Sequence, residues 1–141
     1  MLVNGHLILN QLFNLMRKIL LVLISLLSYK CYAQISPDLI IGKWLKTSKE
    51  DLIIEVYKFK NEYRGKITWS KDNGKLIGFQ ILEGLRYDAS GIIWSNGKIT
   101  SPKSGSTYSA IAKIRTDGIL EVLAYKGFKF FGRKKYFRRV K

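Results

Sequence analysis

The chain of 141 residues has few of the side chains on which enzyme active sites most often depend. Its only His (His6), its only Cys (Cys31) and both Met residues (Met1 and Met16) lie before Gln34. From Gln34 onward there is no thiol and no imidazole, which excludes Cys and His nucleophiles, Ser-His triads, disulfides and zinc sites of the usual nitrogen and sulfur kind. We therefore assign no catalytic residue, no metal and no cofactor to this part, and expect a protein that is not an enzyme.

Acidic residues are also scarce. The chain has 25 Lys and Arg against 10 Asp and Glu, and three of the basic residues but none of the acidic ones precede Gln34. The remainder thus holds 22 basic and 10 acidic residues, a net charge of +12. A charge of this size favours anionic partners such as lipid head groups, envelope glycans or nucleic acid. A solvated surface without a partner is the alternative.

A basic segment followed by a short apolar run predicts a signal peptide. Met16-Arg17-Lys18 carries the charge, 19–28 is apolar, and the small residues Cys31 and Ala33 stand at positions −3 and −1 of a cleavage site after Ala33. The run is shorter than the roughly 20 apolar residues that span a bilayer. We expect a signal peptide over residues 1–33, with Met16 as the true start because no positive charge precedes it.

The remaining residues, 34–141, are expected to form one exported domain, periplasmic or secreted, with no transmembrane span. Lys30 stands directly before Cys31, where lipid attachment would require a small residue. We therefore expect no lipid anchor at this cysteine. Export also argues against nucleic acid as a partner.

Short runs of alternating apolar and polar residues, separated by turn residues at about ten-residue intervals, predict an all-β domain. Short connections in sequence order favour a single antiparallel up-and-down barrel of about eight strands, with a two-sheet sandwich as the alternative. Gly97 predicts a bulge or a bend in the fifth strand. The expected strands are 40–46, 52–60, 63–70, 79–87, 92–100, 107–115, 119–126 and 130–140.

Strand alternation also predicts which side chains share a face. In the third strand, one face is expected to carry Tyr63, Gly65, Ile67 and Trp69. In the fourth strand, one face is expected to carry Phe79, Ile81, Leu85 and Tyr87, and Glu83 falls on this apolar side as an exception.

The motifs of the domain resemble a bacterial exported family catalogued as domain of unknown function 2147. They occur in order over nearly all of 40–140, and include Ile41-Gly42-Lys43-Trp44-Leu45, Tyr63-Arg64-Gly65-Lys66-Ile67-Thr68-Trp69 and Gly105-Ser106-Thr107-Tyr108-Ser109. A Gly-x-Trp in the first strand with an Arg in the last is also typical of lipocalin-like barrels. The resemblance implies a small lipocalin-like domain without an established activity, and it supplies no catalytic residues.

Trp44 and Arg139 are the expected closure of the barrel, with the guanidinium over the indole in a cation–π contact. Arg133 and Arg138 are alternatives for the same place, because strand parity alone does not decide among the three. Aromatic side chains with polar tips suit the wall of a ligand cavity, and a filled core is the alternative. The candidate ligand-binding residues are Tyr57, Tyr63, Trp69, Tyr87, Trp94 and Tyr108.

The last strand predicts a basic surface, since basic and aromatic residues interleave from 126 to 141. Alternation places several basic groups on one outer face, which suits lipid head groups or acidic glycans, with a solvated face as the alternative. The candidates are Lys129, Arg133, Lys134, Lys135 and Arg138.

These features support one main hypothesis and two alternatives. The main one is an exported barrel, not an enzyme, that binds a small apolar or anionic molecule, a lipid, or an anionic envelope surface. The first alternative is a structural or interaction domain with a filled barrel. The second is a hydrolase that relies on carboxylates within apolar strands, namely Glu55, Glu83 and Glu121.

Overall fold

The computed structural model describes residues 2–28 and 34–141, and the chain divides into two units, 1–34 and 35–141. The first unit contains one helix, α1 (Leu2–Leu27). Its part Asn4–Leu27 is long and apolar enough to cross a membrane, a property that signal sequences share. The helix is longer than the apolar run 19–28 because leucine-rich sequence also precedes Met16. The predicted cleavage site and Cys31 lie outside the described residues.

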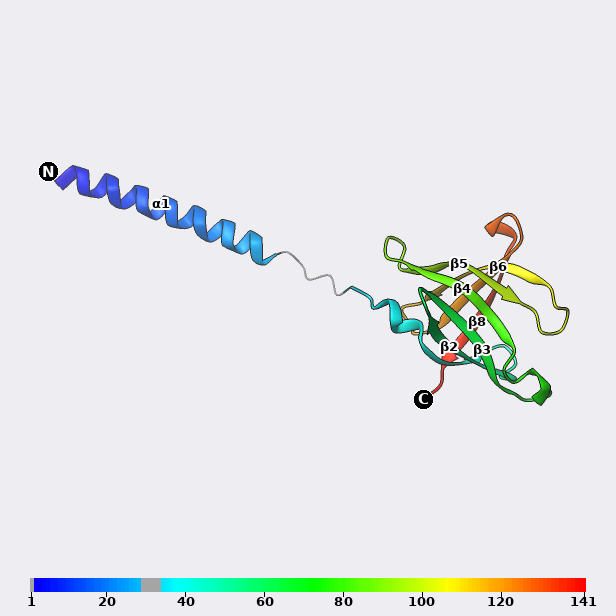
Figure 1. Ribbon diagram of the computed structural model, residues 1–141. Coiled ribbons are helices and arrows are strands. Elements are labelled where there is room, and N and C mark those ends of the chain that lie inside the picture. Colours follow the sequence, from blue (N-terminus) through cyan, green and yellow to red (C-terminus); the bar gives the residue numbers. More distant parts are fainter. Residues whose placement is uncertain (1, 29–33) are drawn as a thin grey trace. The chain divides into compact units, whose positions relative to one another are not determined.

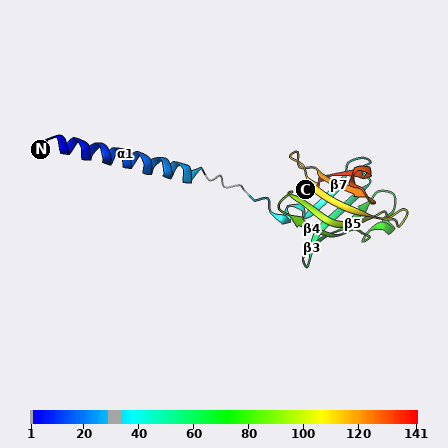
Figure 2. The ribbon, with the colours of Figure 1, turned by 90° about the horizontal axis from the view of Figure 1, so that it is seen from above.

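The second unit is a closed antiparallel barrel in which each strand pairs with the next in sequence and the last pairs with the first (Figures 1 and 2). This confirms the predicted up-and-down barrel and shows that the sandwich alternative is wrong. The strands are β1 (Gly42–Lys46), β2 (Leu52–Phe59), β3 (Glu62–Ser70), β4 (Gln80–Asp88), β5 (Ile93–Thr100), β6 (Thr107–Ile114), β7 (Leu120–Tyr125) and β8 (Arg133–Arg139).

Three short 3₁₀ helices lie outside the strands: η1 (Pro37–Ile40), η2 (Gly74–Leu76) and η3 (Lys129–Phe131). The last strand therefore begins three residues later than predicted, because η3 takes up the aromatic residues that the sequence placed in it. Since all connections are short, η1 lies at one end of the barrel, and η2 and η3 lie at the other (Figure 1).

A bulge between β2 and β3 reverses the predicted direction of Trp69. Ile53 pairs with Trp69 whereas Ile54 pairs with Ile67, so Thr68 is an extra residue. Ile67 is fully buried, but Trp69 is 40% exposed on the outer face. The prediction that Trp69 shares the inner face with Ile67 is wrong because one extra residue exchanges the two faces of a strand.

Further register shifts, two between β3 and β4 and one between β5 and β6, shape the neighbouring strands. Glu83 and Gly84 together stand opposite one residue of β3, so Glu83 is exposed while Leu85 stays in the core. Simple alternation predicts that Glu83 points into the barrel, and this is wrong because the bulge turns its side chain outward. In β5, Trp94 pairs with Ala112 and Gly97 with Ala110, which confirms the bulge predicted near Gly97.

The hydrophobic core fills the barrel from the end that carries η1. Its largest fully buried side chains include Trp44, Trp94 and Phe137, and every residue of the core belongs to residues 40–137. The second unit thus contains both its closed sheet and its whole core. We therefore expect this unit to fold without the first one.

Candidate functional site

One end of the barrel is closed by the segment 35–41, which we call the plug. The indoles and phenols of four core aromatic residues donate hydrogen bonds to it. The bonds run from Trp44 Nε1 to the Ile40 carbonyl (2.9 Å), Trp94 Nε1 to the Pro37 carbonyl (3.0 Å), Tyr63 Oη to Asp38 Oδ1 (2.6 Å) and Tyr87 Oη to the Ile35 carbonyl (3.1 Å). The plug satisfies the polar tips of these large side chains, which buried aromatic groups require.

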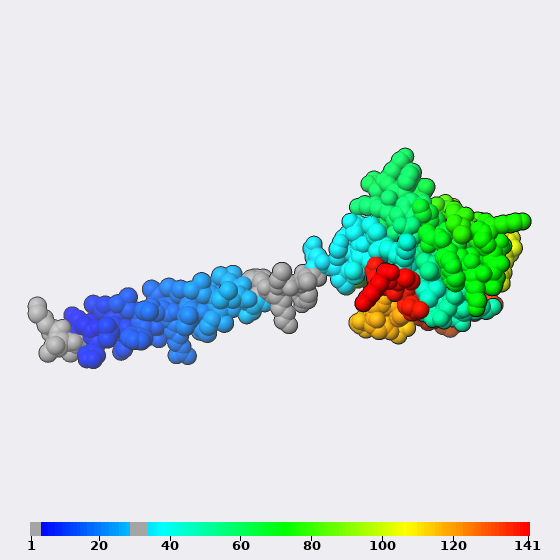
Figure 3. Space-filling model, turned by 90° about the horizontal axis from the view of Figure 1, so that it is seen from below, coloured from blue at the N-terminus to red at the C-terminus, as the bar shows by residue number. Residues whose placement is uncertain are grey.

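Arg139 ties the last strand to the plug. Its guanidinium lies 4.2 Å from the Trp44 ring centroid and donates hydrogen bonds to the carbonyls of Leu39 and Ile41. Gly42 makes this possible, because a Cβ at its position would stand 2.6 Å from Arg139 Nη1 and its φ is +140°. Figure 3 shows the segment after residue 34 (cyan) beside the last residues of the chain (red). The Gly-x-Trp motif and Arg139 thus belong to one contact.

Tyr63 and Asp38 affect each other's ionisation at this end. Burial and the hydrogen bond to Asp38 raise the pKa of Tyr63 to about 12. The same hydrogen bond, with the nearby Lys58 ammonium, holds the pKa of Asp38 below its ordinary value. The pair therefore keeps a neutral phenol and an ionised carboxylate over a wide pH range.

The six aromatic residues predicted to bind a ligand do not line one cavity. Tyr63, Tyr87 and Trp94 contact the plug at the closed end. Tyr57 faces outward and donates to Gln80 Oε1 at 2.8 Å, and the bulge turns Trp69 outward into a groove with Leu45 and Ile53. Tyr108 alone of the six lines the pocket at the opposite end.

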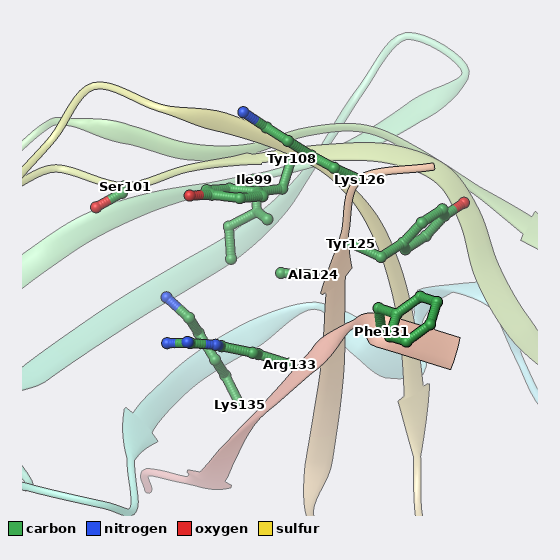
Figure 4. Close-up of a pocket in the computed structure, with 9 residues that line it drawn as sticks. All are labelled: Ile99, Ser101, Tyr108, Ala124, Tyr125, Lys126, Phe131, Arg133 and Lys135. Atoms are coloured by element: carbon green, nitrogen blue, oxygen red, sulfur yellow. The ribbon is translucent and has the colours of Figure 1, made fainter. Parts of the chain in front are cut away.

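The opposite end of the barrel contains a pocket of about 490 Å³, which we call the open-end pocket. Its walls come from β5, β6, β7 and β8 and from the connections at this end. The lining residues are Ile99, Ser101, Tyr108, Ala124, Tyr125, Lys126, Phe131, Arg133 and Lys135 (Figure 4). The largest core side chains pack at the closed end, whereas this pocket lies at the other end, so the filled-barrel alternative does not describe the open end.

Small side chains contribute to the space. Ala124 lines the pocket and pairs with Ala110 across β6 and β7. Both alanines are buried on the inner face, where a larger residue would fill the barrel. Figure 4 shows the polar ends of Tyr108, Arg133 and Lys135 on one side of Ala124, and the rings of Tyr125 and Phe131 on the other. The pocket therefore has a polar side and an aromatic side.

The inner face of β8 brings two cations to this pocket. Arg133 pairs with Ala124 and Lys135 pairs with Val122, and residues directly opposite each other in a sheet share a face. Within residues 2–28 and 34–141, no carboxylate forms an ion pair with either side chain. Burial, with the positive charge of Lys46, lowers the pKa of Lys135 below its ordinary value.

The other predicted basic residues lie elsewhere, so the five do not form one outer face. Lys134 contacts Glu121 at 3.3 Å and Arg138 contacts Glu50 at 3.3 Å on the outside of the barrel, and Lys129 belongs to η3. The prediction was wrong for Arg133 and Lys135 because both lie on the same face of β8 as the buried Phe137, and this face points inward. Their spacing of two and four residues from the apolar Phe137 was the signal that could have identified them.

The carboxylates predicted for a hydrolase do not converge on the open-end pocket. Glu55 lies 4.0 Å from Lys66, and Glu121 contacts Lys113 and Lys134. Glu83 lines a pocket of about 190 Å³ with Glu62, which already binds the guanidinium of Arg64. Among the described residues, no group of three His, Cys, Asp or Glu side chains is placed to hold a metal ion.

The fold is shared with a solved structure. The Helicobacter pylori protein HP1028, described as belonging to the lipocalin family, matches this chain with a TM-score of 0.58 and 16% sequence identity. The match covers 72% of this chain and 83% of HP1028. The likeness at this identity establishes a lipocalin-like fold. No curated protein sequence matches the chain.

A family model agrees with the motifs described above. The model for DUF2147, described as an uncharacterized protein conserved in bacteria, matches residues 42–139. This range begins at the glycine of the Gly-x-Trp motif and ends at Arg139, so it spans the barrel from its first strand to its last. The chain therefore belongs to the DUF2147 family of bacterial proteins.

Proposed function

We propose that this protein is an exported, non-enzymatic barrel that binds a small anionic amphiphile in the open-end pocket. The observation that carries the proposal is the pair Arg133 and Lys135, two cations on the inner face of β8 that pair with no described carboxylate and line a cavity of about 490 Å³. Ligand pockets commonly measure about 300–1,000 Å³. The lipocalin-like fold and the family are consistent with a small-ligand-binding role.

The chemistry of the lining suggests how such a ligand would lie. A carboxylate or phosphate would accept charge-assisted hydrogen bonds from Arg133 and Lys135, which are the stronger class of hydrogen bond. An apolar chain would contact Ile99, Ala124 and the ring of Tyr108. Because Lys135 is partly desolvated beside another cation, an anion would also relieve an unfavourable charge.

The pocket favours binding over catalysis. Its described lining has hydroxyl, ammonium and guanidinium groups but no carboxylate, so it lacks the paired acid and base of a glycosidase. The lining has two lysines and two tyrosines, but no described carboxylate or imidazole that would activate one of them as a nucleophile. Binding of an amphiphile requires neither feature.

Calorimetric titration of residues 34–141 with decanoate tests the proposal. We expect decanoate to bind and decyltrimethylammonium, which has the same chain and the opposite charge, not to bind. Replacement of Lys135 by Gln should weaken decanoate binding roughly 10- to 100-fold, as expected when a charged hydrogen-bond donor is lost.

Lys60→Gln is the matched control, since this exposed lysine lies in the β2–β3 connection at the closed end. It should bind decanoate like the wild type. Equal affinity of the wild type and Lys135→Gln for decanoate, or equal affinity of the wild type for both probes, would contradict the proposal.

A further inference from the structure

The connection between β7 and β8 exposes an unusual amount of aromatic surface. Phe128, Phe130 and Phe131 have 76%, 91% and 77% of their surface exposed. We call the connection, residues 126–132, the aromatic tip. Single exposed apolar residues are common, whereas a contiguous group marks an interaction site. In Figure 1 the tip (orange) lies at the far edge of the barrel from the plug.

The tip is held in a defined shape. The Phe131 amide donates to the Phe128 carbonyl at 3.2 Å, and the Gly132 amide donates to the Lys129 carbonyl at 3.0 Å. The backbone of Gly132 packs so closely on Leu123 that a Cβ would stand 2.6 Å from Leu123 Cδ1. The rings of Phe130 and Phe131 contact each other edge to face at 5.4 Å. The rings are therefore displayed by the fold itself.

The segment around these rings carries only basic charges. Lys126, Lys129, Arg133 and Lys134 lie in or beside the tip and are exposed, and Lys134 also pairs with Glu121 on β7. Glu121 is the last acidic residue of the chain, so none follows over the final 20 positions. An apolar group surrounded by cations complements a surface that has an apolar interior and anionic head groups.

We propose that the aromatic tip docks this protein on lipid bilayers with anionic head groups. The rings of Phe128 and Phe130 enter the boundary between head groups and acyl chains, where apolar side chains gain from burial. Lys129 and its basic neighbours contact lipid phosphates, and each cation near an anionic membrane adds to binding. The docking does not depend on a ligand, since Phe128, Phe130 and Lys129 are not part of the open-end pocket.

Docking through the tip would also bring the open-end pocket close to the membrane, a consequence that matters only if the proposed function holds. Phe131, Lys126 and Arg133 belong both to the tip or its flank and to the lining of the open-end pocket. A docked barrel would therefore hold the pocket mouth against the membrane. An anionic amphiphile would then enter the pocket from the bilayer without crossing water.

Sedimentation of residues 34–141 with vesicles tests the docking without the apolar helix α1. We expect binding to vesicles of phosphatidylglycerol and phosphatidylcholine, and at least tenfold weaker binding to phosphatidylcholine alone. The double variant Phe128→Ser, Phe130→Ser should lose roughly tenfold or more in partitioning, since two aromatic rings no longer leave water. Lys129→Glu should lose roughly fivefold or more for its change of charge.

The matched controls are Ile92→Ser and Lys60→Glu, which change an exposed apolar residue and an exposed cation at the closed end. Both should bind vesicles like the wild type. Unchanged binding by the Phe128, Phe130 double variant would overturn the proposal. So would a shift from dimer to monomer in that variant without a change in vesicle binding, since the tip would then be a contact between two copies of this chain.

The double variant also separates the two proposals. It should still bind decanoate with wild-type affinity, because neither ring lines the open-end pocket. Lys135→Gln should still bind vesicles, because Lys135 faces the barrel interior. A wild type that binds anionic vesicles selectively but does not bind decanoate contradicts only the proposed function. A wild type that binds decanoate but does not prefer anionic vesicles contradicts only the docking.

Discussion

Arg139 shows how one side chain makes several contacts that close the barrel. It stacks on Trp44 and donates to two carbonyls of the plug, and Gly42 leaves room for it. A methionine at this position keeps much of the aliphatic packing but loses the charge and both hydrogen bonds. We expect Arg139→Met to lower the free energy of unfolding by about 1–3 kcal/mol.

Urea unfolding of residues 34–141 measures this change. Gly42→Ala should cost a similar amount, about 1–3 kcal/mol, because it combines an unfavourable φ with displacement of Arg139. Since both variants lose the same contact, the double variant should cost less than the sum of the two single costs. Strict additivity would show that Gly42 and Arg139 act separately.

Lys135 is the residue at which pH should reveal the ligand site. Its pKa lies below the ordinary 10.5 because of burial and Lys46, and a bound anion would raise it again. As the pH rises through the lowered pKa toward 10.5, the free protein loses this proton first, so decanoate affinity should fall and binding should take up a proton. Calorimetry in two buffers of different ionisation enthalpy measures the uptake.

The same pKa sets the sign of the stability effect. Between the lowered pKa and 10.5, the unfolded chain binds more protons than the folded one, so the contribution of Lys135 to stability increases with pH. Lys135→Gln should remove both this dependence and the proton uptake on binding. Proton uptake that persists in the variant would assign it to another group.

At the scale of the strand, bulges decide which aromatic residues belong to the core. Trp69 and Trp94 look equivalent in the alternating sequence, but the bulge at Thr68 turns Trp69 outward while Trp94 is fully buried. We expect Trp94→Ala to cost about 3–5 kcal/mol, as for other buried aromatic residues, and Trp69→Ala to cost no more than about 1 kcal/mol. Urea unfolding of residues 34–141 compares the two.

Fluorescence gives an independent measure of the same difference. Acrylamide should quench Trp69 strongly and Trp94 weakly, and the comparison uses variants in which the other two tryptophans are replaced by Phe. A large stability loss in Trp69→Ala with protection from quenching would contradict its outward position.

The strands themselves were predictable because their alternation and turn residues repeat along the whole domain. The directions of the side chains were less predictable, because each bulge adds one residue to a strand and so exchanges its two faces, which simple alternation does not anticipate. Glu83 carried a visible signal, a charge on an apolar face, and Gly97 marked its own bulge. Thr68 carried none, so Trp69 was placed inside.

The candidate site was harder to predict than the fold for a related reason. Basic residues in a strand predict a face that points to solvent, yet Arg133 and Lys135 lie on the same face of β8 as the buried Phe137. The small alanines that leave room for the pocket pair across β6 and β7, and that register follows from the folded barrel rather than from any local motif. The plug was equally hidden, since its hydrogen bonds join residues far apart in the chain.

At the scale of the whole molecule, α1 and the barrel favour different surroundings: the helix an apolar one, the barrel water. The helix exposes apolar side chains along its length, which is unfavourable in water, whereas the barrel buries its own core and carries a surplus of cations. Cleavage of the helix during export would leave α1 in the membrane and release the barrel into water. We therefore expect the protein recovered from the periplasm of a Gram-negative host to have the intact mass of residues 34–141.

Two substitutions in α1 test this export in detail. Leu21→Arg places a charge within the apolar run after Met16, so export should fail and the precursor should accumulate, because a central arginine costs roughly 2.5–3.5 kcal/mol on membrane insertion. Leu7→Arg lies before Met16, and should leave both export and the mature mass unchanged if translation begins at Met16. A membrane-bound product that keeps α1 would instead show that the helix is an anchor, and the aromatic tip would then act on a barrel already tethered to the bilayer.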